Sequence, residues 1–207
     1  TQDLCDVCAV SYDDVCAAAR TLGNPDLHIV NLHPTRLADI WSDFAKVAEA
    51  VGTDPSPAIA AMHGRVETVR TRTAGLSRPR VLTIEWLAPV MVGGTWMPEL
   101  VEIAGGEPLV TRPGQHAPTL PDEAVAALEP EVVLIKPCGF DIDRTFAERA
   151  RVQQLAAMFP RARTYVADGN AYFNRPGPRI VDSLEILAAA VHPEVFGADD
   201  RLVAVQW

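Results

Sequence analysis

The stretch from Arg80 to Gly106 reads RVLTIEWLAPVMVGGTWMPELVEIAGG, and the rest of the chain can be organised around it. Its start, Val81–Ile84, is a short β-rich run that predicts a buried strand, ending at Glu85–Trp86. Pro98 suits the first turn of a helix, and Gly105–Gly106 end that helix because glycine adopts the left-handed cap conformation. The pattern therefore predicts a strand, an aromatic loop carrying Gly93–Gly94, and a helix.

Two tryptophans, Trp86 and Trp96, flank this loop. The carboxyl end of a strand is where an α/β fold places a ligand, and an indole offers flat apolar area for stacking. The alternative is that both indoles are partly buried in an ordinary connection between a strand and a helix. Both interpretations fit the pattern.

Composition and charge narrow the class of protein. With 48% apolar and 22% charged residues among 207, the chain can build an ordinary core in one large domain or two small ones. The net charge of -9 argues against a nucleic-acid partner and against binding to an anionic membrane surface. No apolar run approaches the roughly 20 residues that span a bilayer. The chain begins at Thr1 and shows no signal segment.

The four cysteines are Cys5, Cys8, Cys16 and Cys138, too few and too unevenly spaced for a disulfide framework. Cys5-x-x-Cys8 is half of a zinc or redox signature, but a zinc site needs a second pair or nearby histidines. We therefore expect no metal site, and either reduced thiols or a local Cys5–Cys8 bridge.

Periodicity predicts alternating strands and helices along the chain, and hence a mainly parallel sheet covered on both faces. The expected strands are 27–32, 81–84, 108–110, 132–135 and 164–167. The expected helices are 11–22, 35–51, 57–75, 98–104, 121–128, 143–159 and 178–191. The apolar end, 202–207, has no assigned element.

The helix that starts at Pro57 divides the chain. It would be roughly 28 Å long at 1.5 Å per residue, and it lies between two α/β segments, as a rigid connector between lobes would. The sequence thus predicts an N-terminal lobe segment at 1–54, a backbone helix at 55–78 and a C-terminal α/β lobe at 79–207.

No catalytic constellation is visible, because the chain has no G-x-S-x-G, Walker or H-E-x-x-H motif. Glu85 is the best isolated acid or base, but a single carboxylate without a partner is weak evidence for catalysis. We therefore expect no enzyme. Convergence of Glu85 with a second titratable group such as Lys136 would instead favour an enzyme.

The loops after three predicted strands share another chemistry. Flat apolar area comes from Trp86, Trp96, Phe140, Tyr172 and Phe173, and hydrogen-bond donors come from Asn170, Asn174 and Arg175. Such a set suits a large, flat, amide-bearing ligand held by stacking and a few hydrogen bonds. The alternative is that Tyr172 or Phe173 packs beneath Pro176–Pro178.

Three ordered segments also resemble one family. They are EWLAPVMVGGTWMPELVEIAGG at 85–106, IKPCGF at 135–140 and DGNAYFNRPGPR at 168–179. Together they look like the C-terminal lobe of class III (helical-backbone) periplasmic solute-binding proteins of ABC transporters, and are most similar to the cobalamin (vitamin B12)-binding branch. The resemblance implies an α/β fold of two Rossmann-like lobes joined by a long helix.

The family resemblance also implies a function. The protein would carry cobalamin or a related corrinoid to an ABC permease outside the cytoplasm, as a transported ligand rather than a cofactor. Haem, a ferric siderophore, or a role as an enzyme that processes corrinoids or metal chelates are the alternatives. The implied contacts are Glu85, Trp86, Trp96, Cys138, Gly139, Phe140, Asn170, Tyr172, Phe173 and Arg175 for the ligand, and Glu123 for the permease.

The N-terminal lobe is expected to be incomplete. Only one strand and two helices precede the long helix, and in the family a segment like Thr1–Cys5 follows an early strand of the first lobe. Asp3–Cys5 would be the remaining ligand contact from that lobe. Because an incomplete sheet exposes an apolar edge, we expect a homodimer or strand exchange to cover it.

Overall fold

The computed structural model describes Thr1, residues 10–23 and residues 27–205. The predictions for Cys5, Cys8 and Asp3–Cys5 lie outside the described residues. The helices are α1 (Tyr12–Thr21), α2 (Leu37–Val51), α3 (Ser56–Thr73), α4 (Met97–Ile103), α5 (Asp122–Ala126), α6 (Ile142–Ala147), α7 (Arg149–Ala157), the π-helix η1 (Gly169–Phe173), α8 (Ile180–Val191) and α9 (Pro193–Phe196).

The described strands form one mixed sheet, in the order β4-β2-β1-β5-β6-β7, with β3 also paired to β1. They are β1 (Arg80–Leu87), β2 (Val90–Val92), β3 (Glu107–Pro108), β4 (Thr119–Leu120), β5 (Val132–Ile135), β6 (Arg163–Ala167) and β7 (Leu202–Ala204). The centre, β1-β5-β6, is parallel, with Ile84 opposite Ile135 and Ile135 opposite Val166. Every residue of β5 is buried, as expected for a parallel strand covered on both faces.

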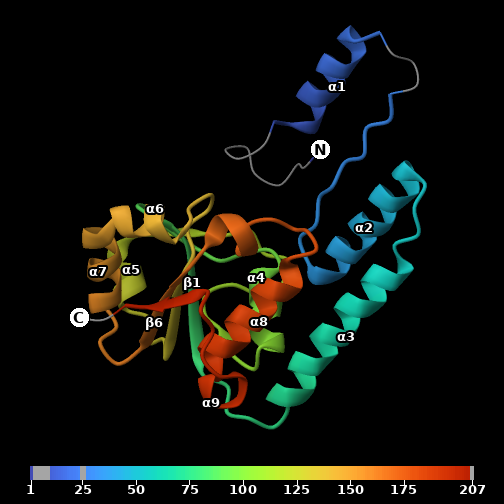
Figure 1. The fold of residues 1–207 in the computed structure, drawn as a ribbon. Coiled ribbons are helices and arrows are strands. Elements are labelled where there is room, and N and C mark those ends of the chain that lie inside the picture. Colours follow the sequence, from blue (N-terminus) through green and yellow to red (C-terminus); the bar gives the residue numbers. More distant parts are fainter. Residues whose placement is uncertain (2–9, 24–26, 206–207) are drawn as a thin grey trace.

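Helices cover both faces of this sheet (Figure 1). On one face, α4 and α8 pack against the sheet and α3 packs outside them, in a core that includes Val69, Leu100 and Leu184. On the other face, α5 and α7 supply Val125 and Leu155 to a second core. The sheet is therefore the middle layer between two apolar cores.

The long helix α3 follows the predicted connector and lies alongside α8 (Figure 1). Its buried side chains include Met62, Val66 and Val69. The stripe of α2 that includes Leu37 and Ile40 belongs to the same core. By contrast, α1 has no buried residue and lies apart from the sheet in Figure 1. The division into lobes stays a prediction.

Several predicted elements match closely. The strand at 132–135 is found with the same bounds, and Ser11 caps α1, its hydroxyl oxygen accepting a hydrogen bond from the Asp14 N–H. Gly105 has a φ of +80°, the left-handed conformation expected after α4.

Two predicted elements were wrong. No strand forms over 27–32; Leu32 makes an isolated bridge, and the described partner of this segment is Thr1, which accepts from the Leu32 N–H. The helix predicted over 143–159 is broken at Glu148, whose backbone leaves the helical region at φ -93°, ψ 31°. The two pieces are α6 and α7.

The strand predicted to end at Glu85–Trp86 instead contains both residues. It continues to Leu87, turns through Ala88–Pro89 and returns as the antiparallel strand β2. The longer strand forms because β2 supplies a second hydrogen-bonding partner. The first part of the predicted aromatic loop is therefore a hairpin, and Gly93–Gly94 follow its second strand. The unassigned end of the chain is also a strand, β7, which pairs antiparallel with β6.

Candidate functional site

Three segments of the candidate site meet at one edge of the sheet. The parallel strands β1, β5 and β6 end at the same edge, and Glu85–Trp86, Lys136–Phe140 and Asp168–Arg175 lie at those ends. In open α/β sheets, ligands bind beyond the carboxyl ends of the strands. The topology thus brings together residues that are separated by up to 90 positions in the chain, since 175 − 85 = 90.

An aromatic pair lies at this edge. The rings of Trp86 and Phe140 meet edge to face, with 5.3 Å between their centroids and 62° between their planes. The Arg144 guanidinium lies over the Phe140 ring, 4.3 Å from its centroid. Trp86 is 37% exposed. This pair therefore presents aromatic area to solvent at the place predicted for a ligand.

The loops after β5 and β6 are joined to each other. The Asn170 N–H donates to the Phe140 carbonyl over 3.1 Å. Gly169 approaches the backbone so closely that an added Cβ would lie 2.2 Å from the Pro137 carbonyl oxygen, so only glycine fits. The chain then forms the π-helical turn η1, a conformation found frequently at functional sites. The contacts fix the two loops as one unit.

The η1 loop carries polar groups that can form hydrogen bonds with a ligand. Arg175 is exposed, and its Nη2 donates to the Asn170 Oδ1 over 2.6 Å. This bond orients the guanidinium and leaves its other donors available for a carboxylate, phosphate or amide oxygen. The Asn174 Oδ1 is buried and accepts no hydrogen bond from the described residues.

A buried ion pair lies beneath the same edge. Lys136 is 0% exposed, and its Nζ contacts the Oε1 of Glu85, whose side chain is 15% exposed. The two residues follow the paired Ile135 and Ile84, so the register of the parallel strands sets them side by side. The same Nζ lies 5.8 Å from the centroid of the Phe173 ring.

From the sequence, we expected that an enzyme would bring Glu85 close to a second titratable group such as Lys136, and the structure contains this contact. It also has a structural explanation, because burying an ammonium group costs several kcal/mol unless an opposite charge accompanies it. Glu85 supplies that charge. Lys136, enclosed by protein, has no exposed surface on which to meet a substrate.

Two of the predicted contact residues lie in the core instead. Trp96 is only 6% exposed, and its Nε1–H donates to the Phe173 carbonyl over 3.2 Å. Phe173 is fully buried. The other predicted contacts remain at the edge: Tyr172, Cys138 and Asn170 are half-buried, and Gly139 is exposed with a φ of +75°.

Glu123, the predicted docking residue, is exposed on α5. Its neighbour Asp122 forms a two-pronged ion pair with Arg151 of α7, at 2.6 and 2.7 Å. Hydrogen bonds from this guanidinium hold the pKa of Asp122 below its usual value. The first turn of α5 is therefore anchored to α7.

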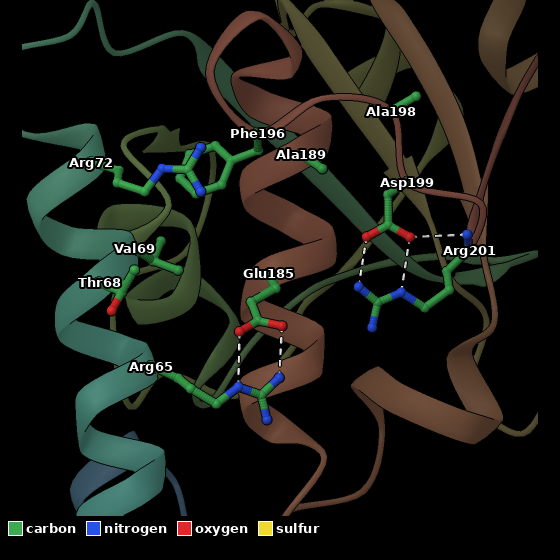
Figure 2. Close-up of a pocket in the computed structure, with 10 residues that line it drawn as sticks. All are labelled: Arg65, Thr68, Val69, Arg72, Glu185, Ala189, Phe196, Ala198, Asp199 and Arg201. Carbon is green, nitrogen blue, oxygen red and sulfur yellow. Dashed lines mark hydrogen bonds and ion pairs between the residues drawn. The ribbon is translucent and has the colours of Figure 1, made fainter.

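Two hollows are lined by other residues. One, of about 280 Å³, is enclosed by α3, α8, α9 and the segment before β7 (Figure 2). Two of its arginines are paired with carboxylates, Arg65 with Glu185 and Arg201 with Asp199, and the third, Arg72, stacks on Phe196. The second, of about 520 Å³, is lined by Ser77, Pro79, Glu131, Arg161, Arg163, Val191, His192 and Glu194. Neither includes a predicted site residue.

Within residues 10–23 and 27–205, no three His, Cys, Asp or Glu side chains gather as a metal site requires. No helix in the described part of the chain has the length and hydropathy of a membrane span.

No family model and no curated protein matches the sequence, but solved structures match the fold. A periplasmic haem-binding protein from Pseudomonas aeruginosa is 23% identical with a TM-score of 0.75, covering 94% of this chain and 73% of its own. BtuF, the periplasmic vitamin B12-binding protein of Vibrio cholerae, is 17% identical with a TM-score of 0.66, covering 91% and 72%. IsdE of S. aureus, complexed with haem, is 12% identical with a TM-score of 0.70, covering 87% and 73%.

The chain has the class III solute-binding-protein fold. The α/β class and the class III fold that the three segments predicted are thus confirmed, while the two lobes and the incomplete N-terminal lobe stay predictions. Two of these neighbours are periplasmic binding proteins, one for haem and one for vitamin B12, and the third was solved with haem bound.

The contact between Glu85 and Lys136 was predicted only as a sign of catalysis, and its structural role was missed. The signal available in the sequence was the two parallel strands, each of which has a charged residue directly after its isoleucine. Recognising the pair requires the register between the strands, which periodicity within one strand does not contain.

Proposed function

We propose that this class III-fold protein is the substrate-binding component of an ABC uptake system, with its ligand at the carboxyl edge of the sheet. The observation that carries the proposal is the joined set of loops around Trp86, Phe140, Asn170 and Arg175. A preorganised face of aromatic area with a few oriented donors suits ligand capture, since little entropy is lost on binding. The solved neighbours support the same role.

We propose a flat metal chelate as the ligand, with cobalamin or a related corrinoid as the first candidate. The ring stacks on Trp86 and contacts Phe140 beside it, while Asn170 and Arg175 bind its amide or acidic side groups. Glu85, Cys138, Gly139 and Tyr172 complete the contact set, and Trp96 and Phe173 support it from the core. Haem and ferric siderophore are the alternative ligands; haem and vitamin B12 both occur among the neighbours.

The lobes and partners follow from this role. Residues 1–54 belong to the lobe that faces the ligand, 55–78 form the backbone helix, and 79–207 form the lobe that carries the described site. Glu123 binds a cationic side chain of the permease, and the protein works outside the cytoplasm. A homodimer covering the N-terminal segment remains part of the proposal.

The test is a titration of the whole chain with cyanocobalamin and, separately, with haemin, followed by calorimetry and by ligand absorbance. We expect Trp86→Ala to weaken binding about tenfold, equivalent to about 1.4 kcal/mol, because the stacking area is lost. Trp41→Phe on α2 is the control and retains affinity. Binding of neither probe to the wild-type chain, or equal binding by Trp86→Ala, contradicts the proposal.

The contact between Glu85 and Lys136 favours a second candidate, an enzyme that processes corrinoids or metal chelates. In that case Glu85 transfers a proton and the bound chelate is chemically changed. Recovery of the probe after long incubation separates the two functions. An unchanged absorbance spectrum and mass support a binding protein, and a product that disappears in Glu85→Gln supports the enzyme.

A further inference from the structure

Arg151 on α7 makes contacts with two other elements at once. Its Nε–H donates to the Leu87 carbonyl over 2.9 Å, and its two terminal nitrogens bind both oxygens of Asp122. The side chain is only 17% exposed. An arginine fork held in this way fixes direction as well as distance, because its donors lie in one rigid plane.

The first contact is with the β1–β2 hairpin, which carries Trp86. This hairpin is part of the candidate ligand face, the surface around Trp86, Phe140, Asn170 and Arg175. Leu87 is the last residue of β1 and directly follows Trp86. The returning strand, β2, pairs with β4, where Val90 lies opposite Leu120. The hairpin that carries Trp86 is therefore held on one side by Arg151 and on the other by β4.

The second contact is with α5, the helix that carries the proposed docking residue Glu123. Asp122 is the first residue of α5, and the exposed Glu123 is the next. Strand β4 runs directly into this helix through Pro121. Two routes thus connect Trp86 to Glu123: the ladder from β2 to β4, and the guanidinium of Arg151.

We propose that Arg151 is a positioning residue that couples the ligand face to the docking surface, so that a ligand stacked on Trp86 changes the position of Glu123. This inference rests on the proposed function. The physical basis is that one rigid fork joins the end of β1 to the first turn of α5. A shift of the hairpin on ligand binding then displaces Asp122 rather than being absorbed between them.

Arg151→Lys distinguishes coupling between Trp86 and Glu123 from a role of Arg151 in stability alone. Lysine keeps a positive charge for Asp122 but is a single flexible point charge, so it cannot bond Leu87 and both carboxylate oxygens in one plane. The thermal midpoint should therefore stay close to that of the wild type while the coupling through residue 151 is weakened. Arg151→Met removes both contacts, and Arg149→Met, on the exposed side of the same helix, is the matched control.

The first measurement is hydrogen exchange of the whole chain with and without cyanocobalamin or haemin. In the wild type we expect the probe to slow exchange in 86–91 and also in 122–126, by about fivefold, the lower end of typical couplings between sites. In Arg151→Lys, protection should remain in the hairpin and become weaker in α5, where only the route through β2 and β4 is left. Equal protection of α5 in wild type and Arg151→Lys overturns the proposal.

The second measurement needs no ligand. The measured quantity is the quenching of tryptophan fluorescence by acrylamide. Subtracting the fluorescence of the Trp86→Phe variant isolates the contribution of Trp86. We expect Asp122→Asn and Arg151→Met to change this quenching, and Glu123→Gln and Arg149→Met to leave it unchanged. If Trp86 quenching is the same in all variants, the link is absent. Failure of the wild type to bind either probe counts against the proposed ligands alone, and the quenching result then decides the link.

Discussion

Helices α1 and α8 were predicted by the same reasoning, yet they differ in what they bury. Ten of the twelve residues of α8 are buried, whereas α1 has none, although Tyr12, Val15, Cys16 and Ala19 form an apolar stripe. The difference lies in what surrounds each helix. α8 packs between the sheet and α3, while α1 lies away from both (Figure 1). An apolar stripe specifies a helix, but burial requires a surface that faces it.

This contrast locates the stability of the described chain. Removing apolar surface from water stabilises the folded state by about 25 cal/mol per Å². That stabilisation is concentrated in the two cores beside the sheet, because all the described buried apolar residues except Ala48, Ala156 and Ala189 belong to them. Variants on the two sides therefore test the comparison directly.

The largest effect is expected in the core of α8. Leu184→Ala removes a fully buried side chain and leaves a cavity, so it should lower the free energy of unfolding by about 3.5 kcal/mol. Leu22→Ala, next to α1 at a position 72% exposed, should change it by less than about 0.5 kcal/mol. Chemical denaturation measures both. Equal losses would show that α1 is packed in solution.

The next effect concerns the ion pair beneath the ligand face. Glu85→Gln leaves the ammonium of Lys136 buried without a counter-charge and should cost about 2 kcal/mol, less than for a fully enclosed pair because Glu85 is partly exposed. The double variant Glu85→Gln with Lys136→Met should regain most of the loss. A double-mutant cycle by denaturation measures the coupling, and additive losses would contradict it.

A smaller effect is expected where α3 meets α8. Arg65 binds Glu185 and Asp182 but is about half exposed, so Arg65→Met should cost about 1 kcal/mol. The control is Arg70→Met, which removes the well-exposed i,i+3 pair with Glu67 and should change stability by a few tenths of a kcal/mol. If the two variants lose the same free energy of unfolding, the ion pairs of Arg65 do not hold α3 to α8.

The smallest effect is a pH dependence. Hydrogen bonds from Arg201 lower the pKa of Asp199 below its usual 3.8, so this carboxylate stabilises the fold above that pH. The stabilisation is lost as the pH falls below 3.8 toward the lowered folded-state pKa. Stability of Asp199→Asn, measured from pH 6 to pH 2.5, should be below the wild type at the upper end and approach it at the lower end. A constant difference across this range would contradict the assignment.

Much of the sheet side was predictable because its signals are local. The apolar run Val132–Ile135 and the cap at Gly105 each depend on neighbouring residues, and the structure places both as predicted. The convergence of three loops at one edge also followed, because parallel strands end together. The strand β7 did not follow, since it forms by pairing with β6. The break at Glu148 did not follow either, since no proline or glycine marks it in the sequence.

The sequence by itself determined the α/β class, most of the helices and the central parallel strands, and the composition of the three loops that follow β1, β5 and β6. Only the tertiary structure decided which of their side chains remain accessible. In the structure, Trp96 and Phe173 are buried in the core, Trp86 is exposed, and Lys136 forms an ion pair with Glu85. The physical reason is that periodicity records the direction of a side chain relative to its own strand or helix, whereas burial and pairing depend on what packs against it.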